Sequence, residues 1–387
     1  MAKLGEVFTI ASGGTPDKKK PFYYENGTIP WVKTGDLKAQ YVPTGIDCIT
    51  EEGLNNSPAK LFPPNTVLVA MYGATIGACS ILSYEAATNQ ACAAFLPNEN
   101  VLPTYLYYFL LSKRDQFVKD GVGGAQPNIS AGYLKKVQFD LVPVRQQEVI
   151  VERLDEIENL IALRKEQLAK LDQLVKSRFI ELFGDPVANT FGWKQALLRE
   201  VTSKIGSGAT PRGGKESYQA EGITLIRSMN VHDGRFEYKD LAHITDEQAE
   251  QLDNVTVEDG DVFINITGAS VARSCIVPKD TLPARVNQHV AIIRCVRDQL
   301  HPTFANNMFL NDRFKGQLLD IGESGGATRQ AITKQQLENL AVILPPLELQ
   351  EHFAAFVEQT DKSKLAIQQS LDKLELLKKA LMQKYFG

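Results

Sequence analysis

An internal repeat constrains the fold of this chain more than any other feature of its sequence. Seven segments of the first half recur in the second half in an unchanged order, each 194 to 203 positions after its counterpart. So small a drift in spacing is typical of one structural module used twice, with short insertions in its loops. The paired segments are residues 10–16 with 205–211, 31–37 with 225–231, 67–77 with 262–272, 89–90 with 287–288, 123–130 with 325–333, 141–148 with 344–351, and 183–184 with 386–387.

The first part of each module, residues 1–143 and 198–346, combines short apolar runs with turns rich in Gly, Pro, Asn and Asp. Residues 66–71 and 261–266 have the apolar, partly β-branched composition of strands, whereas residues 104–118 favour a helix. We therefore expect two similar mixed α+β globules, which places the fold in the α/β class.

The second part of each module, residues 144–184 and 347–387, is expected to form one long helix. Neither segment contains Gly or Pro before its final residue. Apolar residues recur at alternating steps of three and four, which forms a seam against another helix. The apolar seam residues are Leu154, Ile157, Ile161, Leu168, Leu171 and Val175 in the first segment and Val357, Ile367, Leu371, Leu374 and Leu381 in the second.

Two arrangements of these helices are compatible with the seam, because each helix can pack on its own globule or the two can pack on each other. A helix of about 39 residues is roughly 58 Å long at 1.5 Å per residue, which exceeds the width of a globule of this size. The second arrangement is therefore favoured. A pseudo-two-fold relation between the modules then makes the helices an antiparallel coiled coil that separates the globules, with residues 185–197 as a linker.

Composition limits the classes of protein to which the chain can belong. It has 387 residues, a net charge of −4 and no apolar run near the roughly 20 residues that span a bilayer. The N-terminus lacks the apolar core of a secretion signal. The five cysteines contain no CxxC pair, so we interpret them as reduced core residues of a cytoplasmic protein.

The sequence carries none of the common catalytic motifs. It contains no NPPF or DPPY loop of adenine methyltransferases, no HExxH metal motif and no GxSxG nucleophile elbow. Residues 208–217 resemble a phosphate-binding P-loop but fail on spacing, because Ala209 stands where the first glycine belongs. We therefore expect no catalytic, cofactor-binding or metal-binding residue in this chain.

The repeated glycine turns and the polar residues near them are candidates for contact with DNA. Glycine and small hydroxyl side chains suit close approach to phosphate, and Arg or Lys at a strand end can reach a guanine edge or a phosphate. For any single residue the alternative is an ordinary solvated turn side chain. The modules share a framework but differ at the loop tips, which predicts readers of two different short sequences. The candidates are Ser12, Thr15, Lys18, Lys19, Lys20, Lys33, Thr34, Tyr72, Thr75, Gln126, Asn128, Ser207, Thr210, Arg212, Lys215, Arg227, Ser228, Thr267, Ser270, Arg273, Arg329 and Gln330.

In content and order these motifs resemble those of the specificity subunits of type I restriction-modification systems. The resemblance rests on SGGTP, WVKTGDL, GATIG, TNQA, GGAQPNIS and LVPVRQQEVIVERLDEI, and on a second round that ends in LPPLELQE, and it covers essentially the whole chain. It implies that residues 1–143 and 198–346 are target recognition domains, and that residues 144–184 and 347–387 are spacer helices that dock methyltransferase subunits. It also implies a bipartite double-stranded DNA target with an unspecified gap.

The resemblance further implies the partners and their cofactors. Two methyltransferase subunits, which use S-adenosylmethionine, would methylate adenine. Two restriction subunits, motor nucleases that use ATP and Mg, would join them to cleave unmethylated DNA. The chain itself would recognise the target sequence, catalyse no reaction and bind no membrane. Three alternatives remain open: a specificity subunit of a modification-only system, an enzyme with an unrecognised site, and a non-enzymatic coiled-coil scaffold.

Overall fold

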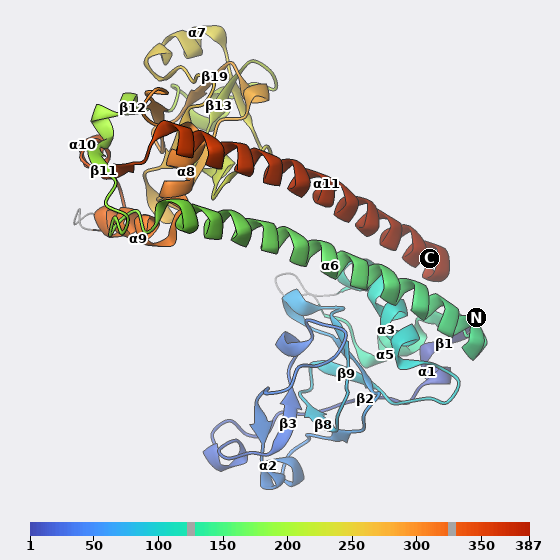
Figure 1. The fold of residues 1–387 in the computed structure, drawn as a ribbon. Coiled ribbons are helices and arrows are strands. Elements are labelled where there is room, and N and C mark those ends of the chain that lie inside the picture. Colours follow the sequence, from blue (N-terminus) through green and yellow to red (C-terminus); the bar gives the residue numbers. More distant parts are fainter. Residues whose placement is uncertain (122–127, 324–329) are drawn as a thin grey trace. The chain divides into compact units, whose positions relative to one another are not determined.

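The computed structural model describes residues 1–121, 128–323 and 330–387 and divides the chain into two compact units. Unit 1 comprises Met1–Lys165 with Gln369–Gly387, and unit 2 comprises Glu166–Gln368. Each unit holds one globule and one part of each of two long helices, α6 (Val144–Phe183) and α11 (Leu347–Phe386) (Figure 1).

The globule of unit 1 is built around two four-stranded sheets. Its strands are β1 (Ala2–Lys3), β2 (Ile10–Ser12), β3 (Ile29–Val32), β4 (Cys48–Ile49), β5 (Leu61–Phe62), β6 (Val67–Ala70), β7 (Cys79–Ile81), β8 (Ala86–Thr88), β9 (Cys92–Phe95) and β10 (Gln138–Phe139). Its shorter helices are α1 (Leu4–Val7), α2 (Glu51–Asn55), α3 (Pro103–Ser112), α4 (Arg114–Asp120) and α5 (Ala131–Lys136). The antiparallel sheet has the order β2-β9-β6-β7, and the mixed sheet has the order β4-β3-β8-β5 with β3 parallel to β8.

The globule of unit 2 repeats this plan with additional hairpins. Its strands are β11 (Lys194–Leu197), β12 (Thr202–Ser207), β13 (Ile223–Ile226), β14 (Val231–His232), β15 (Arg235–Phe236), β16 (Ala242–Ile244), β17 (Val262–Asn265), β18 (Ser274–Ile276), β19 (Ala284–Val286), β20 (Val290–Cys295) and β21 (Ala341–Leu344). Its shorter helices are α7 (Asp246–Glu250), α8 (Pro302–Leu310), α9 (Asp312–Glu323) and α10 (Lys334–Glu338). The main sheets have the orders β12-β20-β17-β18 and β16-β13-β19, with β13 parallel to β19. The predicted pair of similar mixed α+β globules is confirmed.

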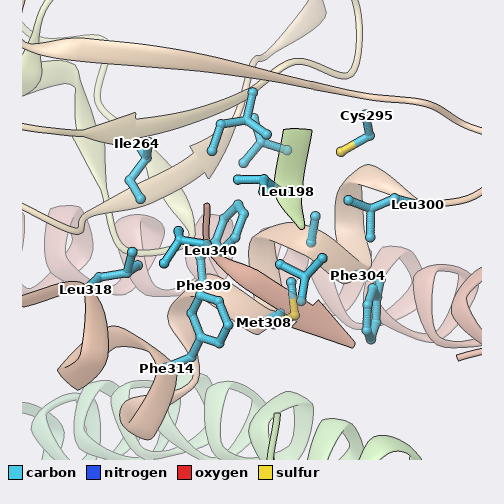
Figure 2. Close-up of a cluster of buried hydrophobic side chains, with 14 of the residues drawn as sticks. Leu198, Ile264, Cys295, Leu300, Phe304, Met308, Phe309, Phe314, Leu318 and Leu340 are labelled. Carbon is cyan, nitrogen blue, oxygen red and sulfur yellow. The ribbon is translucent and has the colours of Figure 1, made fainter. Parts of the chain in front are cut away.

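The central strands are mainly apolar because both faces of their sheet are covered. Side chains of a strand alternate between the two faces. In β17, Val262 and Ile264 pack with the helices of unit 2, whereas Phe263 packs with the sheet that contains β13 and β19. Figure 2 shows the first of these clusters, in which Ile264 lies among Leu198, Leu300, Phe304, Met308, Phe309, Phe314, Leu318 and Leu340.

The helix expected over residues 104–118 is divided in the structure into α3 and α4. The division falls at Lys113, whose φ of −90° and ψ of 1° leave the helical range. Its N–H closes α3 by donating to the carbonyl groups of Leu110 and Leu111, while its ammonium group hydrogen-bonds to the carbonyl group of Phe386. The break thus coincides with a contact to a residue distant in the sequence, which local helix propensity does not report.

In both units α6 and α11 pack against each other in antiparallel register. As the residue number rises along α6, the number of its partner falls along α11. The predicted antiparallel pair of long helices is confirmed. In unit 1 the partners are Arg153 with Tyr385 (3.0 Å), Glu158 with Lys378, and Arg164 with Ser370 (3.2 Å); in unit 2 they are Asp172 with Lys364 (2.7 Å) and Arg178 with the ring of Phe356 (6.0 Å to its centroid).

The seam residues line this packing to different depths. Polar residues that interrupt the apolar spacing, such as Lys364 and Lys378, each form an ion pair with the facing helix. Leu154, Ile157, Ile161, Val175, Val357 and Leu371 are buried, and Leu168, Leu171, Ile367, Leu374 and Leu381 are partly buried.

Among the described residues, no helix combines the length and apolar character needed to cross a membrane.

A buried glutamine fixes the first turn of each long helix to its globule. Gln147 accepts a hydrogen bond from the N–H of Leu102 at 2.9 Å and donates to two carbonyl groups at 2.8 Å. Gln350 accepts from the N–H of His301 at 2.9 Å and donates to two carbonyl groups at 2.8 and 3.1 Å. Both side chains are fully buried. The glutamine repeated in the sequence is therefore a structural anchor.

Candidate nucleic-acid interface

In unit 1 the candidate residues from separate segments meet at one edge of the two sheets. The ends of β2 and β6 both pair with β9, and the N–H of Asn89 after β8 donates to Val32 at the end of the parallel strand β3 (3.0 Å). Tyr72 and Asn128 form an isolated bridge beside them. We call the resulting set polar edge 1; it consists of Ser12, Thr15, Lys33, Thr34, Tyr72, Thr75 and Asn128.

Unit 2 brings the corresponding segments together in the same way. The ends of β12 and β17 pair with β20, and the N–H of Asn287 after β19 donates to Ile226 at the end of β13 (3.0 Å). Thr267 bridges to Ala331, and the N–H of Gly268 donates to the carbonyl group of Gln330 at 2.9 Å. We call this set polar edge 2; it consists of Ser207, Thr210, Arg227, Ser228, Thr267, Ser270 and Gln330.

The doubled glycine turn is explained by close packing of the backbone. A Cβ atom on Gly13 would lie 1.9 Å from the carbonyl oxygen of Thr88, and one on Gly208 would lie 1.7 Å from that of Val286. Any side chain at these positions would collide with the end of β8 or β19. The N–H groups of Gly14 and Gly208 already donate to carbonyl groups within their own units, at 2.9 and 3.1 Å. These amides are therefore engaged in holding the turn and are not presented to phosphate.

A threonine–glutamine hydrogen bond closes the same turn in both units. Thr15 Oγ1 donates to Gln90 Oε1 at 2.5 Å, and Thr210 Oγ1 donates to Gln288 Oε1. The hydroxyl proton is used inside the unit, so the lone pairs of each threonine remain available as acceptors. The repeated glutamine is thus a scaffold residue next to each candidate surface.

The repeated cation at the end of β3 or β13 has an internal partner in each unit. Lys33 forms an ion pair with Asp47, and this hydrogen bond raises the pKa of the Lys33 ammonium group. Arg227 donates to the backbone carbonyl group of Asp240, and its guanidinium carbon lies 5.4 Å from the ring centroid of Tyr218. Lys33 is thus held by an exposed carboxylate, which solvent weakens, whereas Arg227 is held by backbone and an aromatic ring.

The turn after the central strand faces open space in both units. Gly73 and Gly268 have φ values of +68° and +75°, a left-handed conformation that favours glycine, and an added Cβ would meet nothing within 4 Å. The residue before each glycine differs. The Tyr72 side chain is 45% exposed, whereas the half-buried Thr267 places Oγ1 2.5 Å from His289 Nδ1.

The remaining basic candidates lie close in the sequence to members of these edges. Lys18, Lys19 and Lys20 are exposed, and a hydrogen bond to the hydroxyl of Tyr23 (3.2 Å) raises the pKa of Lys20. Arg212 is exposed, and Arg273 Nη1 lies 3.4 Å from His232 Nδ1. Gln126 and Arg329 lie outside the described residues, as does the side chain of Lys215.

Four of the five cysteines are buried as expected of core residues, whereas Cys48 is only partly buried. All five thiols are free, and burial raises the pKa of Cys92, Cys275 and Cys295 to about 12, well above the range of a reactive thiolate. Within residues 1–121, 128–323 and 330–387, no group of His, Cys, Asp and Glu side chains could hold a metal ion.

Sequence reasoning missed several residues that shape these edges. His289 bridges to Thr267, and Tyr218 packs on Arg227. His289 has no counterpart of the same type in the other module, where Ala91 stands, so the repeat gave no signal for it. Tyr218 corresponds to Tyr24 of the first module, and this repeated tyrosine is the signal that could have found it. His289 directly follows the repeated Asn-Gln pair but occurs in only one module. A module-specific polar residue beside a repeated segment is a signal that could have identified it.

Comparison with known proteins identifies relatives of the whole chain. A family model described as the type I restriction modification DNA specificity domain matches residues 1–173 and 192–377. The specificity subunit of type I restriction enzyme EcoR124I/EcoR124II from Escherichia coli is 30% identical over 162 residues, which are 41% of this chain and 40% of that protein. The specificity subunit of type I restriction enzyme MjaIX from Methanocaldococcus jannaschii is 24% identical over 416 residues, which cover 99% and 91% of the two chains.

A solved structure shares the fold. A chain from work on the complex assembly and conformational transition of the type I R-M system matches with a TM-score of 0.62 at 19% sequence identity, and the match covers 100% of this chain and 96% of that one.

Proposed function

Because this chain belongs to the family of type I restriction-modification DNA specificity subunits, we propose that it reads a bipartite DNA target, one half with each globule. The chain is a specificity subunit and not an enzyme, and the family binds no cofactor itself. In such a target the bases are read by hydrogen bonds at their edges, while contacts to phosphate fix position.

The observation that carries this proposal is the duplicated polar edge. The two units use the same strand ends, the same glycine turn and the same threonine–glutamine hydrogen bond. The side chains presented there differ, with Lys33 and Tyr72 in polar edge 1 against Arg227 and Thr267 in polar edge 2. One framework with different polar side chains is suited to two readers of different short sequences.

The exposed face of the helix pair is our proposed docking surface for two modification subunits. Leucines on α6 and α11 lie outside the seam and leave about half or more of their surface exposed. Exposed apolar side chains that lie close together mark sites of contact with other proteins, so the exposed leucines of each helix are candidates for such contact. The most exposed are Leu163 (53%), Leu174 (47%), Leu365 (61%), Leu376 (69%) and Leu377 (47%).

The proposed division of labour assigns the chemistry to those partners. The modification subunits, with S-adenosylmethionine, methylate adenine within the target, and restriction subunits, with ATP and Mg, cleave unmethylated DNA. This chain brings those subunits to the target DNA sequence. Isolation of the tagged chain from its host decides how complete the assembly is: a methyltransferase without a motor subunit would identify a modification-only system.

Methylome sequencing of cells that express this chain with its modification subunit tests the proposal. We expect one methylated bipartite motif. Lys33→Ala should relax base preference in one half of that motif and Arg227→Ala in the other half. If either substitution relaxed both halves together, the residue would be a folding or phosphate contact. If the wild-type chain produced no motif, the proposed function would be wrong.

The length of the gap is a second test. We propose that the helix pair sets the number of unspecified base pairs between the half-targets. Seven residues added in register to both α6 and α11 lengthen each helix by about 10 Å, so the gap should grow by roughly three base pairs at 3.4 Å per base pair. An unchanged gap would refute this use of the helices.

A further inference from the structure

Unit 2 contains a chain of hydrogen bonds that joins two separate segments of polar edge 2. It begins at Thr210, whose hydroxyl group hydrogen-bonds to Gln288 Oε1. Gln288 Nε2 lies 3.2 Å from His289 Nε2. His289 Nδ1 in turn lies 2.5 Å from Thr267 Oγ1. The turn after β12 and the turn after β17 are thus linked through one imidazole ring.

The chemistry of each group fixes the direction of these hydrogen bonds. The amide oxygen of Gln288 carries no proton, so the hydroxyl of Thr210 donates to it. The amide nitrogen of Gln288 has no lone pair, so it donates to His289 Nε2, which is therefore unprotonated. The single proton of the neutral imidazole then sits on Nδ1 and is donated to Thr267 Oγ1.

This direction decides what each threonine can offer to a ligand. Thr210 uses its proton on Gln288 and offers only lone pairs. Thr267 Oγ1 accepts a hydrogen bond from the N–H of His289, so its own hydroxyl group is free to donate one. Thr267 is only half-buried and stands next to Gly268, where the turn faces open space. Polar edge 2 therefore presents an acceptor at Thr210 and a donor at Thr267.

We propose that His289 is a positioning residue of the unit 2 reader, which fixes Thr267 as a hydrogen-bond donor to an acceptor atom on a base edge. The inference rests on the proposed function of the polar edges. A donor facing the major groove matches N7 of a purine, O6 of guanine or O4 of thymine, and it disfavours the amino groups of adenine and cytosine. His289 would thus contribute to base choice through Thr267, without itself touching DNA.

Unit 1 provides the internal control. There the hydrogen-bond chain runs from Thr15 to Gln90 and cannot continue, because the next residue is Ala91. The counterpart of Thr267 is Tyr72, whose phenol is not set by an imidazole from that position. A change at His289 should therefore alter the half-target of unit 2 and leave the half-target of unit 1 as it was.

The test uses the full chain assembled with its modification subunit, and methylome sequencing as the readout. We expect His289→Ala and Thr267→Val each to lower base discrimination at the same position of one half-target by about five- to tenfold, the loss of one oriented hydrogen bond. His289→Asn should keep discrimination near that of the wild type, because its amide N–H can replace Nδ1–H as the donor to Thr267.

A reversal of the hydrogen bond sharpens the test. In His289→Asp the carboxylate can only accept, so Thr267 must donate inward and offer lone pairs to DNA. The preferred base should then change toward one with an amino group at that edge. Ala91→Asp places the same charge at the corresponding position of unit 1 and controls for repulsion between the carboxylate and DNA phosphates.

Each outcome decides the inference. Unchanged discrimination in both His289→Ala and Thr267→Val, with a wild-type motif present, would overturn it and leave the proposed function intact. A uniform loss of methylation with base preference unchanged would place Thr267 on a phosphate and would also overturn it. Because Thr267→Val leaves the histidine in place, it keeps the test valid if His289→Ala fails to fold. A wild-type chain without any motif would overturn the proposed function and, with it, this inference.

Discussion

The two globules place the same strands in the same order, yet they fill one corresponding position in opposite ways. In unit 2 the buried carboxylate of Asp261 accepts two hydrogen bonds from Arg294 at 2.8 Å. In unit 1 the repeat places Thr66 and Leu96 there, and the hydroxyl of Thr66 donates to the carbonyl group of Pro63 at 2.8 Å. The fold therefore accommodates either a neutral hydrogen bond or an ion pair at this position. Both units nevertheless keep the glycine turn and the glutamine anchor.

The largest expected difference between the units follows from this ion pair. Asp261→Ala should destabilise unit 2 by about 2–3 kcal/mol, because the partly buried guanidinium group of Arg294 loses its two hydrogen bonds to the buried carboxylate and keeps only Glu258 and the carbonyl group of Thr256 as partners. Thr66→Ala should cost unit 1 only about 1 kcal/mol. Denaturant unfolding followed by tryptophan fluorescence separates the two effects, because Trp31 lies in unit 1 and Trp193 in unit 2.

A matched double variant controls this comparison. Asp261→Thr combined with Arg294→Leu copies the residues of unit 1 into unit 2 and removes both charges together. It should recover most of the stability lost in Asp261→Ala, since replacing a whole buried ion pair is often neutral. If Asp261→Ala were as mild as Thr66→Ala, the proposed contrast between the two globules would not hold.

Removal of the glutamine anchors should destabilise the two units equally, whereas removal of the ion pair should affect them differently. Gln147→Leu and Gln350→Leu should each destabilise their own unit by about 2–3 kcal/mol, because each removes three hydrogen bonds and leaves a backbone N–H unpaired. The exposed neighbour Gln146 supplies the control, since Gln146→Leu should change stability little. Markedly unequal losses, measured by the same fluorescence assay, would show that only one helix depends on its anchor.

Alkaline pH should separate the units again, by a smaller amount. In α3, burial raises the pKa of Tyr105 to about 12, and it raises the pKa of Tyr107 and Tyr108 as well. The corresponding residues of α8 include no tyrosine, although Tyr238 elsewhere in unit 2 has a pKa raised to about 12 by burial. Unit 1 therefore contains more tyrosines that resist ionisation.

The sign of the pH effect follows from these raised pKa values. An unfolded chain releases tyrosine protons near pH 10, whereas the folded unit holds them until higher pH. The stabilisation is complete below pH 10 and decreases as the pH rises toward 12. At pH 11 unit 1 should lose about 1–2 kcal/mol more than unit 2, measured by urea unfolding of single-tryptophan variants. Tyr107→Phe should reduce that loss, and equal losses in the two units would contradict the assignment.

The features that could be predicted from sequence are those encoded by local spacing. The helix over residues 144–184 and the antiparallel pairing follow from a three- and four-residue period and a repeat, both of which are visible in a linear chain. The strand content of residues 66–71 and 261–266 is likewise local. The division of the helix at Lys113 was missed, and the contact made by that side chain, to the carbonyl group of Phe386, joins residues far apart in the sequence.

The candidate site was less accessible to sequence reasoning because its important contacts join distant residues. Gly13 was interpreted as suited to approach by phosphate, but the space beside it is filled by Thr88. Thr15 and Gln90 are 75 positions apart, so their hydrogen bond could not be inferred from either segment alone. His289 was missed because it occurs in only one module, with Ala91 at the corresponding position of the other. Which chemical groups meet at each edge depends on strand pairing, which spacing alone does not specify.

The smallest expected effect concerns the two repeated cations. The Lys33–Asp47 ion pair is exposed, with 39% and 66% of the side-chain surfaces accessible, so it should contribute about 0–1 kcal/mol to stability. Asp47→Asn should therefore leave unit 1 folded while releasing the Lys33 ammonium group for contact with the target DNA. Affinity for target DNA should rise about two- to fivefold at low salt, and log affinity should fall more steeply with log salt, by about one unit of slope.

In unit 2, Asp240→Ala should have no such effect, because Arg227 is held by the backbone carbonyl group of that residue, which alanine retains. Salt titrations of DNA binding by the assembled complex measure both variants. An unchanged slope in Asp47→Asn would mean that the released Lys33 ammonium group does not reach the DNA, and an equal gain in Asp240→Ala would mean that the two cations are restrained in the same way.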